Sequence, residues 1–316
     1  MRLALALLLT LILLAGVAWA FAEWLGAAGV VQAASAIALL LAFAALLSAL
    51  GQVVATVLDP DPMRARGANA GVVWAREFGH FLWCFFLAQP LLSWLMARTK
   101  VPHKPRAVVV FAHGFLCNRG LWWRWRSAWH RAGFVTVVLD LPPFYWSPER
   151  NRKQLQDALQ QAAERFRLPL CVVGHSMGGM IGRMQLCTAE PEISALVSLG
   201  APFQGTLLAG QMGGLDHGPP VPHSPWMLAF NQRFPPVHDH RCVNFWSAND
   251  CIVVPASSCT LAALHDRPKH HLGHMGLCQS KALCLEALAA ADRLLWPEMA
   301  QVGLEVSPSP QTGSAG

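Results

Sequence analysis

Two long apolar runs stand near the start of the chain. Residues 3–22 form an apolar or near-apolar run of 20 residues behind Arg2, and residues 33–50 form a second run interrupted by only two serines. Runs of about 18 to 20 apolar residues can cross the hydrocarbon core of a bilayer. The pattern predicts a membrane anchor of two transmembrane helices over residues 1–58. The first run also fits a cleaved signal peptide, because residues 18–20 (AWA) match a small-x-small cleavage pattern.

A third apolar stretch, residues 81–96, is shorter and contains a glutamine and a proline. It lies between Arg76 and Arg98, and positive charge on both sides indicates a segment at the membrane interface. Residues 59–106 are therefore interpreted as a juxtamembrane, interfacial segment that ends in a basic linker. Two spans with the N-terminus inside place the rest of the chain on the cytoplasmic side. The topology inverts if the third stretch spans or the first run is cleaved.

After residue 106 the pattern changes to short β-branched runs that alternate with helical patterns. This alternation is typical of a parallel sheet covered by helices on both faces. We expect an α/β domain over residues 107–296 and a solvated, disordered tail over residues 297–316. The expected strands are 107–112, 134–139, 170–173, 193–199 and 242–246, and the expected helices are 121–131, 152–166 and 178–187.

Composition narrows the class of protein. Charged residues make up 13% of the chain and hydrophobic residues 54%, which excludes a disordered or coiled-coil protein. Only Arg2 and Glu23 are charged within residues 1–58. The net charge of +6 comes without a clear basic patch, so no nucleic-acid partner is expected. The basic excess in residues 59–106 instead suits an anionic lipid surface.

The nine cysteines are scattered and include no CxxC pair. A disulfide or zinc framework is therefore not expected, and a reducing compartment is favoured. The sequence predicts neither a metal nor another cofactor.

The clearest chemical motif is Gly174-His175-Ser176-Met177-Gly178, which follows a predicted strand and precedes a predicted helix. A G-x-S-x-G sequence in this setting is typical of a nucleophile on a sharp turn, where only glycine fits at the flanking positions. Ser176 is then the candidate nucleophile. The N–H of Met177, at the helix N-terminus, is a candidate oxyanion donor. An ordinary structural turn is the alternative.

An upstream turn at His113-Gly114-Phe115 ends the first predicted strand. We expect the N–H of Phe115 to complete the oxyanion hole opposite Met177. By itself this turn also fits an ordinary strand-to-loop glycine turn.

With these motifs the sequence resembles the α/β-hydrolase superfamily, and within it the bacterial lipase and esterase branch. The resemblance covers about residues 107–295 and rests on HGF, GHSMGG, LGAPFQGT, WSANDCIVVP and GHMGL, in that order. Phe203 stands where the related lipase stretch commonly has histidine. The resemblance implies an α/β-hydrolase fold and places the anchor in a bacterial inner membrane.

In this superfamily the catalytic acid and then the histidine follow the serine along the chain. Asp250, just after a predicted strand, is the candidate acid, with Asp266 and Asp239 in reserve. A turn or capping aspartate is the alternative for Asp250. His274 matches the family's histidine, and His271 is next. A zinc site using His270 and His274 would be a different interpretation of this histidine-rich stretch.

The resemblance implies that Ser176, Asp250 and His274 hydrolyse a carboxylic ester through an acyl-enzyme. A lipid or another apolar ester is the expected substrate, because a tethered enzyme meets acyl lipids at high local concentration. Residues 203–241 are the lid candidate, with a plain excursion packed on the core as the alternative. A thioesterase, amidase or acyltransferase could use the same residues, and a non-catalytic membrane protein could use the fold for binding.

Four residues at helical spacing form a further pattern. This stripe fits either a helix face buried against the sheet or a belt at the membrane interface; its members are Trp122, Trp125, Arg126 and Trp129.

Overall fold

The computed structural model describes residues 51–59, 68–142, 147–188, 190–211, 220–235, 239–261 and 265–298, with scattered positions before residue 51. Its centre is a six-stranded sheet in the order β2-β1-β3-β4-β5-β6. Every neighbouring pair is parallel, which confirms the predicted α/β architecture. The strands are β1 Ala107–Ala112, β2 Phe134–Val138, β3 Leu170–His175, β4 Ala195–Leu199, β5 Cys242–Trp246 and β6 His265–Pro268.

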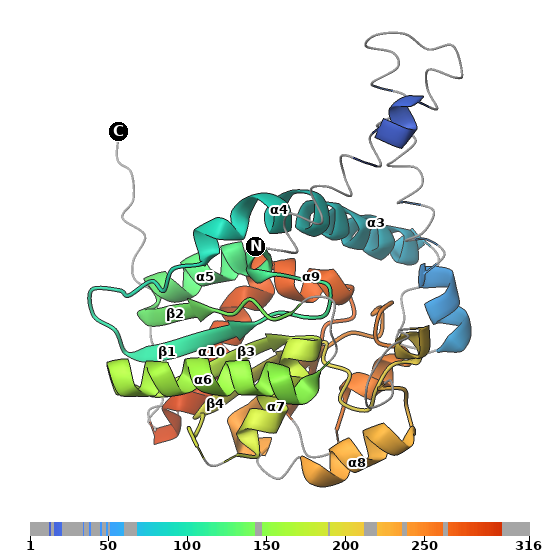
Figure 1. Cartoon of the computed structure of the whole chain (residues 1–316). Coiled ribbons are helices and arrows are strands. Elements are labelled where there is room, and N and C mark those ends of the chain that lie inside the picture. The colour runs from blue at the N-terminus through green and yellow to red at the C-terminus, as the bar shows by residue number, and fades with distance from the viewer. Residues whose placement is uncertain are drawn as a thin grey trace.

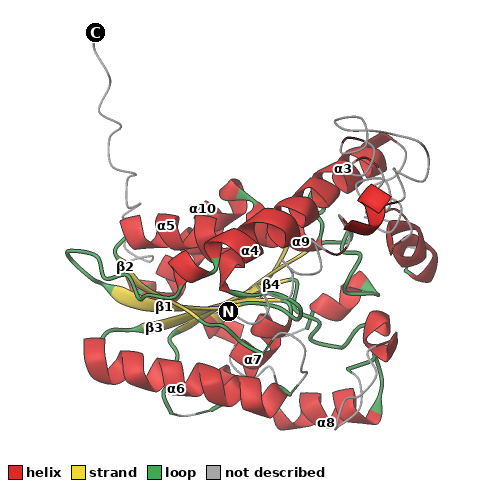
Figure 2. Ribbon diagram, turned by 45° about the horizontal axis from the view of Figure 1, so that its top comes forward, coloured by secondary structure: helices red, strands yellow, loops and turns green. Residues whose placement is uncertain are grey.

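Helices cover both faces of this sheet, as Figures 1 and 2 show. Alternate side chains of β1 enter two separate cores, with Val109 and Phe111 in one and Val108 and Val110 in the other. Side chains that alternate in this way follow from the period of two along a strand. One face carries α5 Trp123–Arg131, α9 His274–Gln279 and α10 Lys281–Leu295, and the other carries α6 Pro148–Phe166, α7 Met177–Leu186 and α8 Pro225–Arg233.

The tryptophan stripe belongs to the buried face of α5 and the turn before it. The side chains of Trp122, Trp125 and Trp129 are fully buried, and Arg126 is 1% exposed. Phe111 of β1 contacts the rings of Trp122 and Trp129, with ring centroids 5.0 and 5.7 Å apart. The buried interpretation is therefore correct for these residues, and the membrane-belt interpretation is wrong because their rings are enclosed by the sheet and its neighbours.

Residues 68–96 form a nearly continuous helical segment that lies over α5 and α9. It consists of α3 Ala68–Leu82, a π-helical turn Trp83–Ala88, α4 Gln89–Leu92 and a 3-10 turn Trp94–Met96. Cys84 and Ala88 are fully buried, so one side of this segment packs on the α/β domain. The other side exposes a set of large apolar residues, namely Phe81, Leu87, Leu91, Trp94 and Leu95.

A buried cation joins the end of this segment to the domain. Arg126 of α5 donates a hydrogen bond to the carbonyl oxygen of Leu95 at 2.8 Å and also to that of Arg98. The last carbonyl groups of a helix lack partners within it, so a guanidinium group at this position satisfies them and complements the helix dipole.

The two predicted membrane spans, residues 3–22 and 33–50, lie largely outside the described residues. Within the part of the chain that the structure describes, no helix combines the length and apolar character needed to cross a bilayer. Nearly all of the predicted tail, from residue 299 onward, also lies outside it.

Candidate active site

Ser176 occupies a sharp turn between β3 and α7. Its backbone has φ 54° and ψ −121°, a conformation that costs a non-glycine residue free energy and persists only where surrounding contacts hold it. Its N–H donates to the carbonyl oxygen of Leu199 at 2.9 Å, which ties the turn to the end of β4. A Cβ atom on Gly174 would lie 2.5 Å from the backbone nitrogen of Gly179, so the turn requires glycine there.

Asp250 and His274, from two different loops, form a buried pair. Asp250 Oδ2 lies 2.6 Å from His274 Nδ1, and the two residues are 0% and 4% exposed. Oδ1 of Asp250 accepts the N–H groups of Ile252 and Val253, both at 2.8 Å. These bonds hold the carboxylate in one orientation and leave Oδ2 directed at the imidazole.

The tight end of β4 brings this pair to the serine turn. Gly200 follows Leu199 with φ +55°, and a Cβ atom there would meet Asp250 Oδ2 at 3.2 Å and His274 Nδ1 at 3.4 Å. Ser176 is bonded to Leu199, directly beside this glycine. The structure therefore places Ser176, Asp250 and His274 at the same edge of the sheet, where β3, β4 and β5 end.

The pKa of His274 is raised above its ordinary value of 6.5. Burial by itself lowers it, but the charge and the hydrogen bond of Asp250 more than offset that effect, with a smaller contribution from Glu77. An imidazole whose charged form is stabilised in this way is suited to receive a proton during a reaction.

His113 holds the upstream turn in place as a neutral residue. Its Nδ1 donates to the carbonyl oxygen of Gly114 at 2.9 Å, and its Nε2 accepts the N–H of Leu141 at 2.9 Å. Burial lowers the pKa of His113 to about 4. Gly114 approaches Ser176 so closely that a Cβ atom on it would lie 2.9 Å from the serine Cβ. Phe115, half-buried, follows in the same turn.

Met177 is the first residue of α7 and is buried. Its position directly after the serine turn, at a helix N-terminus, is where an oxyanion donor is expected. The structure thus brings both the turn that carries Phe115 and the start of α7 next to Ser176, and the oxyanion role of both N–H groups remains a prediction.

The reserve candidates have other surroundings. Asp266 lies in edge strand β6, where Oδ1 accepts from Asn244 at 2.7 Å and burial raises the pKa of its carboxyl group. Asp239 begins a 3-10 turn before β5. His271 is exposed to solvent.

The arrangement of His270 and His274 does not support a zinc site either. His270 accepts the N–H of Ala248 through Nδ1 at 3.1 Å, whereas His274 uses Nδ1 for Asp250. Among the residues that the structure describes, no three histidine, cysteine or acidic side chains gather as a metal site would require.

Two residues near the site were not singled out from sequence. His175, inside the serine motif, donates its Nε2–H to the carbonyl oxygen of His274 at 3.0 Å. Glu77 contacts the chain directly after His274. A sequence signal for Glu77 exists, because it is the only acidic residue between Asp61 and Asp140.

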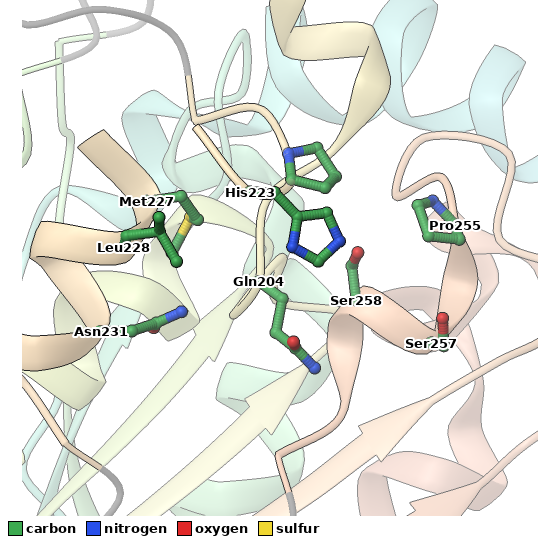
Figure 3. A pocket seen from close by; sticks show the side chains of 9 residues that line it. Gln204, His223, Met227, Leu228, Asn231, Pro255, Ser257 and Ser258 are labelled. Atoms are coloured by element: carbon green, nitrogen blue, oxygen red, sulfur yellow. The ribbon is translucent and has the colours of Figure 1, made fainter. Parts of the chain in front are cut away.

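A pocket of about 290 Å³ lies beside α8, between the segment predicted to form a lid and residues 255–258. Figure 3 shows Leu228 and Asn231 of α8 on one side and Pro255 and Ser257 on the other, with His223 between them. None of the three candidate catalytic residues lines this pocket. Residues 212–219 and 236–238 of the predicted lid lie outside the described residues.

Comparison with known proteins supports the architecture. Residues 107–235 match the family model described as the alpha/beta hydrolase fold. Aspergillus fumigatus lipase B is 14% identical, with a TM-score of 0.50 over 73% of this chain and 60% of that one. The mature lipase BlEst2 of Bacillus licheniformis is 16% identical, with a TM-score of 0.48 over 66% of this chain and 96% of that one.

No curated protein matches the chain. Because Aspergillus fumigatus lipase B shares so little sequence with this chain, its likeness extends to the fold and not to activity. Residues 107–235 of this chain have the α/β-hydrolase fold.

Proposed function

We propose that the chain is a serine hydrolase that cleaves carboxylic esters. The observation that carries this proposal is the buried 2.6 Å contact between Asp250 and His274 at the strand ends where the strained Ser176 turn lies. A nucleophile, a base and an acid that orients the base are the three roles that acyl transfer requires. The similarity of the fold to that of Aspergillus fumigatus lipase B supports the same conclusion.

In the proposed reaction His274 removes the hydroxyl proton of Ser176, and the serine oxygen bonds to the ester carbonyl carbon. The N–H groups of Phe115 and Met177 stabilise the resulting oxyanion, and one such donor contributes about 3 kcal/mol to lowering the barrier. His274 then gives its proton to the alcohol oxygen as the carbon–oxygen bond breaks. Water, activated by the same histidine, releases the acid from the acyl-enzyme and restores the serine.

The proposed substrate is a lipid-like ester, and the proposed location is the bacterial inner membrane. The two apolar runs before residue 58 would tether the enzyme, and the exposed apolar side of residues 81–95 would rest on the lipid surface. Arg98 and Lys100 follow that surface in the chain and are exposed, as expected near anionic headgroups.

The decisive experiment is labelling of the full-length chain in membranes with a fluorophosphonate, which modifies activated serine hydroxyl groups. We expect the wild-type chain to be labelled and Ser176→Ala to remain unlabelled. An unlabelled wild type would overturn the proposal in favour of a binding protein, and equal labelling of Ser176→Ala would show that Ser176 is not the nucleophile. Purified protein would then be assayed with p-nitrophenyl esters of increasing acyl length, phospholipid vesicles, an acyl thioester and an acyl amide. A strong preference for the thioester or amide would replace the ester assignment.

The cytoplasmic placement has a separate test. A reporter that is active only in the periplasm would be fused after Gly316. We expect no reporter activity, and an active fusion would show that the topology is inverted.

A further inference from the structure

Glu77, from the helical segment before the α/β domain, reaches the loop that carries the candidate base. Glu77 is 5% exposed, and its carboxylate accepts two hydrogen bonds from backbone N–H groups. Oε1 accepts the N–H of Met275 at 2.5 Å, and Oε2 accepts the N–H of Gly276 at 2.9 Å. Both donors belong to the first turn of α9, which begins at His274.

The first N–H groups of a helix have no acceptor within it. A carboxylate in this position satisfies two of them and interacts favourably with the partial positive charge of the helix end. The approach depends on Gly273, since a Cβ atom there would lie 2.5 Å from the carboxyl carbon of Glu77. Glu77 therefore fixes the backbone directly after His274. The absence of a side chain at Gly273, directly before His274, leaves room for the carboxylate.

The same helical segment also contacts the chain shortly after the upstream turn, at Asn118 and Gly120. Gln89 Oε1 accepts the N–H of Asn118 at 2.7 Å, and the Gln89 carbonyl oxygen accepts from the Asn118 amide at 3.1 Å. A Cβ atom on Gly120 would lie 2.5 Å from the carbonyl oxygen of Ala88, so the packing here is also close. Glu77 thus bonds to the chain directly after His274, and Gln89 bonds to the chain shortly after the upstream turn.

We propose that Glu77 is a positioning residue for the proposed hydrolysis, because it caps α9 and so holds the backbone at His274 in the geometry that the reaction needs. This inference rests on the function proposed above. It extends the active enzyme beyond the α/β-hydrolase fold to the helical segment of residues 68–96.

The ionisable groups facing His274 come from three places. Asp250 lies in the loop after β5, His175 ends β3, and Glu77 lies on α3, where His80 is 3.9 Å from the Glu77 carboxylate. The negative charge of Glu77 raises the pKa of His274, in addition to the larger effect of Asp250. Removing that charge should therefore lower the pKa of His274. Removing the hydrogen bonds from Glu77 to the start of α9 should displace the His274 side chain.

The test compares Glu77→Gln with Arg76→Gln in the full-length chain. Arg76 is the neighbouring residue and is exposed. We expect Glu77→Gln to lower kcat about 10- to 100-fold, the loss typical of a slightly misplaced catalytic group. KM for a short soluble ester should change little, and the acid limb of the pH profile should move to lower pH. Arg76→Gln should behave as wild type.

The variant Glu77→Asp guards against a loss of folding, which circular dichroism would detect. The shorter side chain keeps the charge but cannot reach both N–H groups, so kcat should fall while the acid limb stays in place. If the folded Glu77→Gln, or Glu77→Asp where the first variant does not fold, retains wild-type kcat and pH profile, the positioning role is wrong. Failure of the fluorophosphonate to label the wild type would instead overturn the proposed hydrolase itself.

Discussion

His175 donates its Nε2–H to the main-chain carbonyl oxygen of His274, and the centroids of the two rings are 4.6 Å apart. Within the described part of the chain, Nδ1 of His175 is buried without a hydrogen-bond partner. Burial and the neighbouring His274 lower the pKa of His175 well below 6.5, whereas the pKa of His274 is raised. The pKa values of these two adjacent histidines are therefore shifted in opposite directions, and the raised pKa of His274 suits its proposed role as the base.

The raised pKa of His274 determines how activity and stability are expected to depend on pH. The proposed base must be unprotonated, so kcat/KM should rise with pH through a midpoint above 6.5. The free energy of unfolding should instead fall as the pH rises through the same range. Because the folded pKa is raised, the stabilisation from charged His274 is fully present below the unfolded value and is lost as pH rises through the folded value. A pH–rate profile together with urea unfolding on both sides of the midpoint would check this; an activity midpoint at or below 6.5 would contradict it.

Asp250→Asn should remove the carboxylate that orients His274. We expect kcat to fall by about 1,000- to 10,000-fold, because the base loses both its tautomer and the stabilisation of its charged form. The remaining activity should have its acid midpoint at lower pH than in the wild type. Steady-state kinetics would measure both effects. Asp266→Asn is the matched control and should retain most of the activity; an equal loss in the two variants would contradict the assignment.

Arg126→Met should detach the end of the helical segment from α5. The guanidinium donates to the carbonyl oxygen of Leu95 at 2.8 Å, and the residue is 1% exposed. Leaving these part-buried carbonyl groups without their donor should lower the free energy of unfolding by about 1 to 3 kcal/mol. Urea unfolding followed by tryptophan fluorescence would measure the loss. Arg131→Met, at an exposed position on the same helix, should cost less than about 1 kcal/mol, and similar losses would show that the buried contact is unimportant.

Leu228→Ser tests whether α8 takes part in handling lipid substrates. Leu228 is 51% exposed and lines the pocket beside α8. If its side chain contacts the acyl chain of the substrate, replacement by serine should lower hydrolysis of vesicle esters about 10-fold, from the lost burial of a leucine. Hydrolysis of p-nitrophenyl acetate should hardly change. Leu285→Ser, at a 52% exposed position on α10, across the sheet, is the control. Equal effects of the two variants on vesicle esters would argue against a role for α8.

Much of the central fold could be predicted because most of its strands are short runs of β-branched and aromatic residues. The predicted strand over residues 107–112 coincides with β1, and the one over residues 242–246 with β5. Strand β6, with the sequence HDRP, was missed because it is short, polar and at the sheet edge. Its strand conformation comes from pairing with β5, which leaves no periodic signal in its own sequence.

The candidate site likewise contains residues that could be predicted from the sequence and residues that could not. Ser176, Asp250 and His274 could be proposed from motifs, because glycines and chain order mark the turn and its partners. The contacts of Glu77 and Gln89 could not, since their partners are backbone N–H groups far along the chain. An apolar helix with arginines at both ends indicates an interfacial segment, and its pattern does not reveal that one side packs on the domain.

The bond between Glu77 and Met275 spans 198 residues. A ribosome adds about 5 to 20 residues per second, so roughly 10 to 40 s separate the synthesis of the glutamate from that of its partner. During this interval the face of α3 that later covers α9 has nothing to pack on. The proposed catalytic geometry is therefore completed only when almost the entire chain has been made.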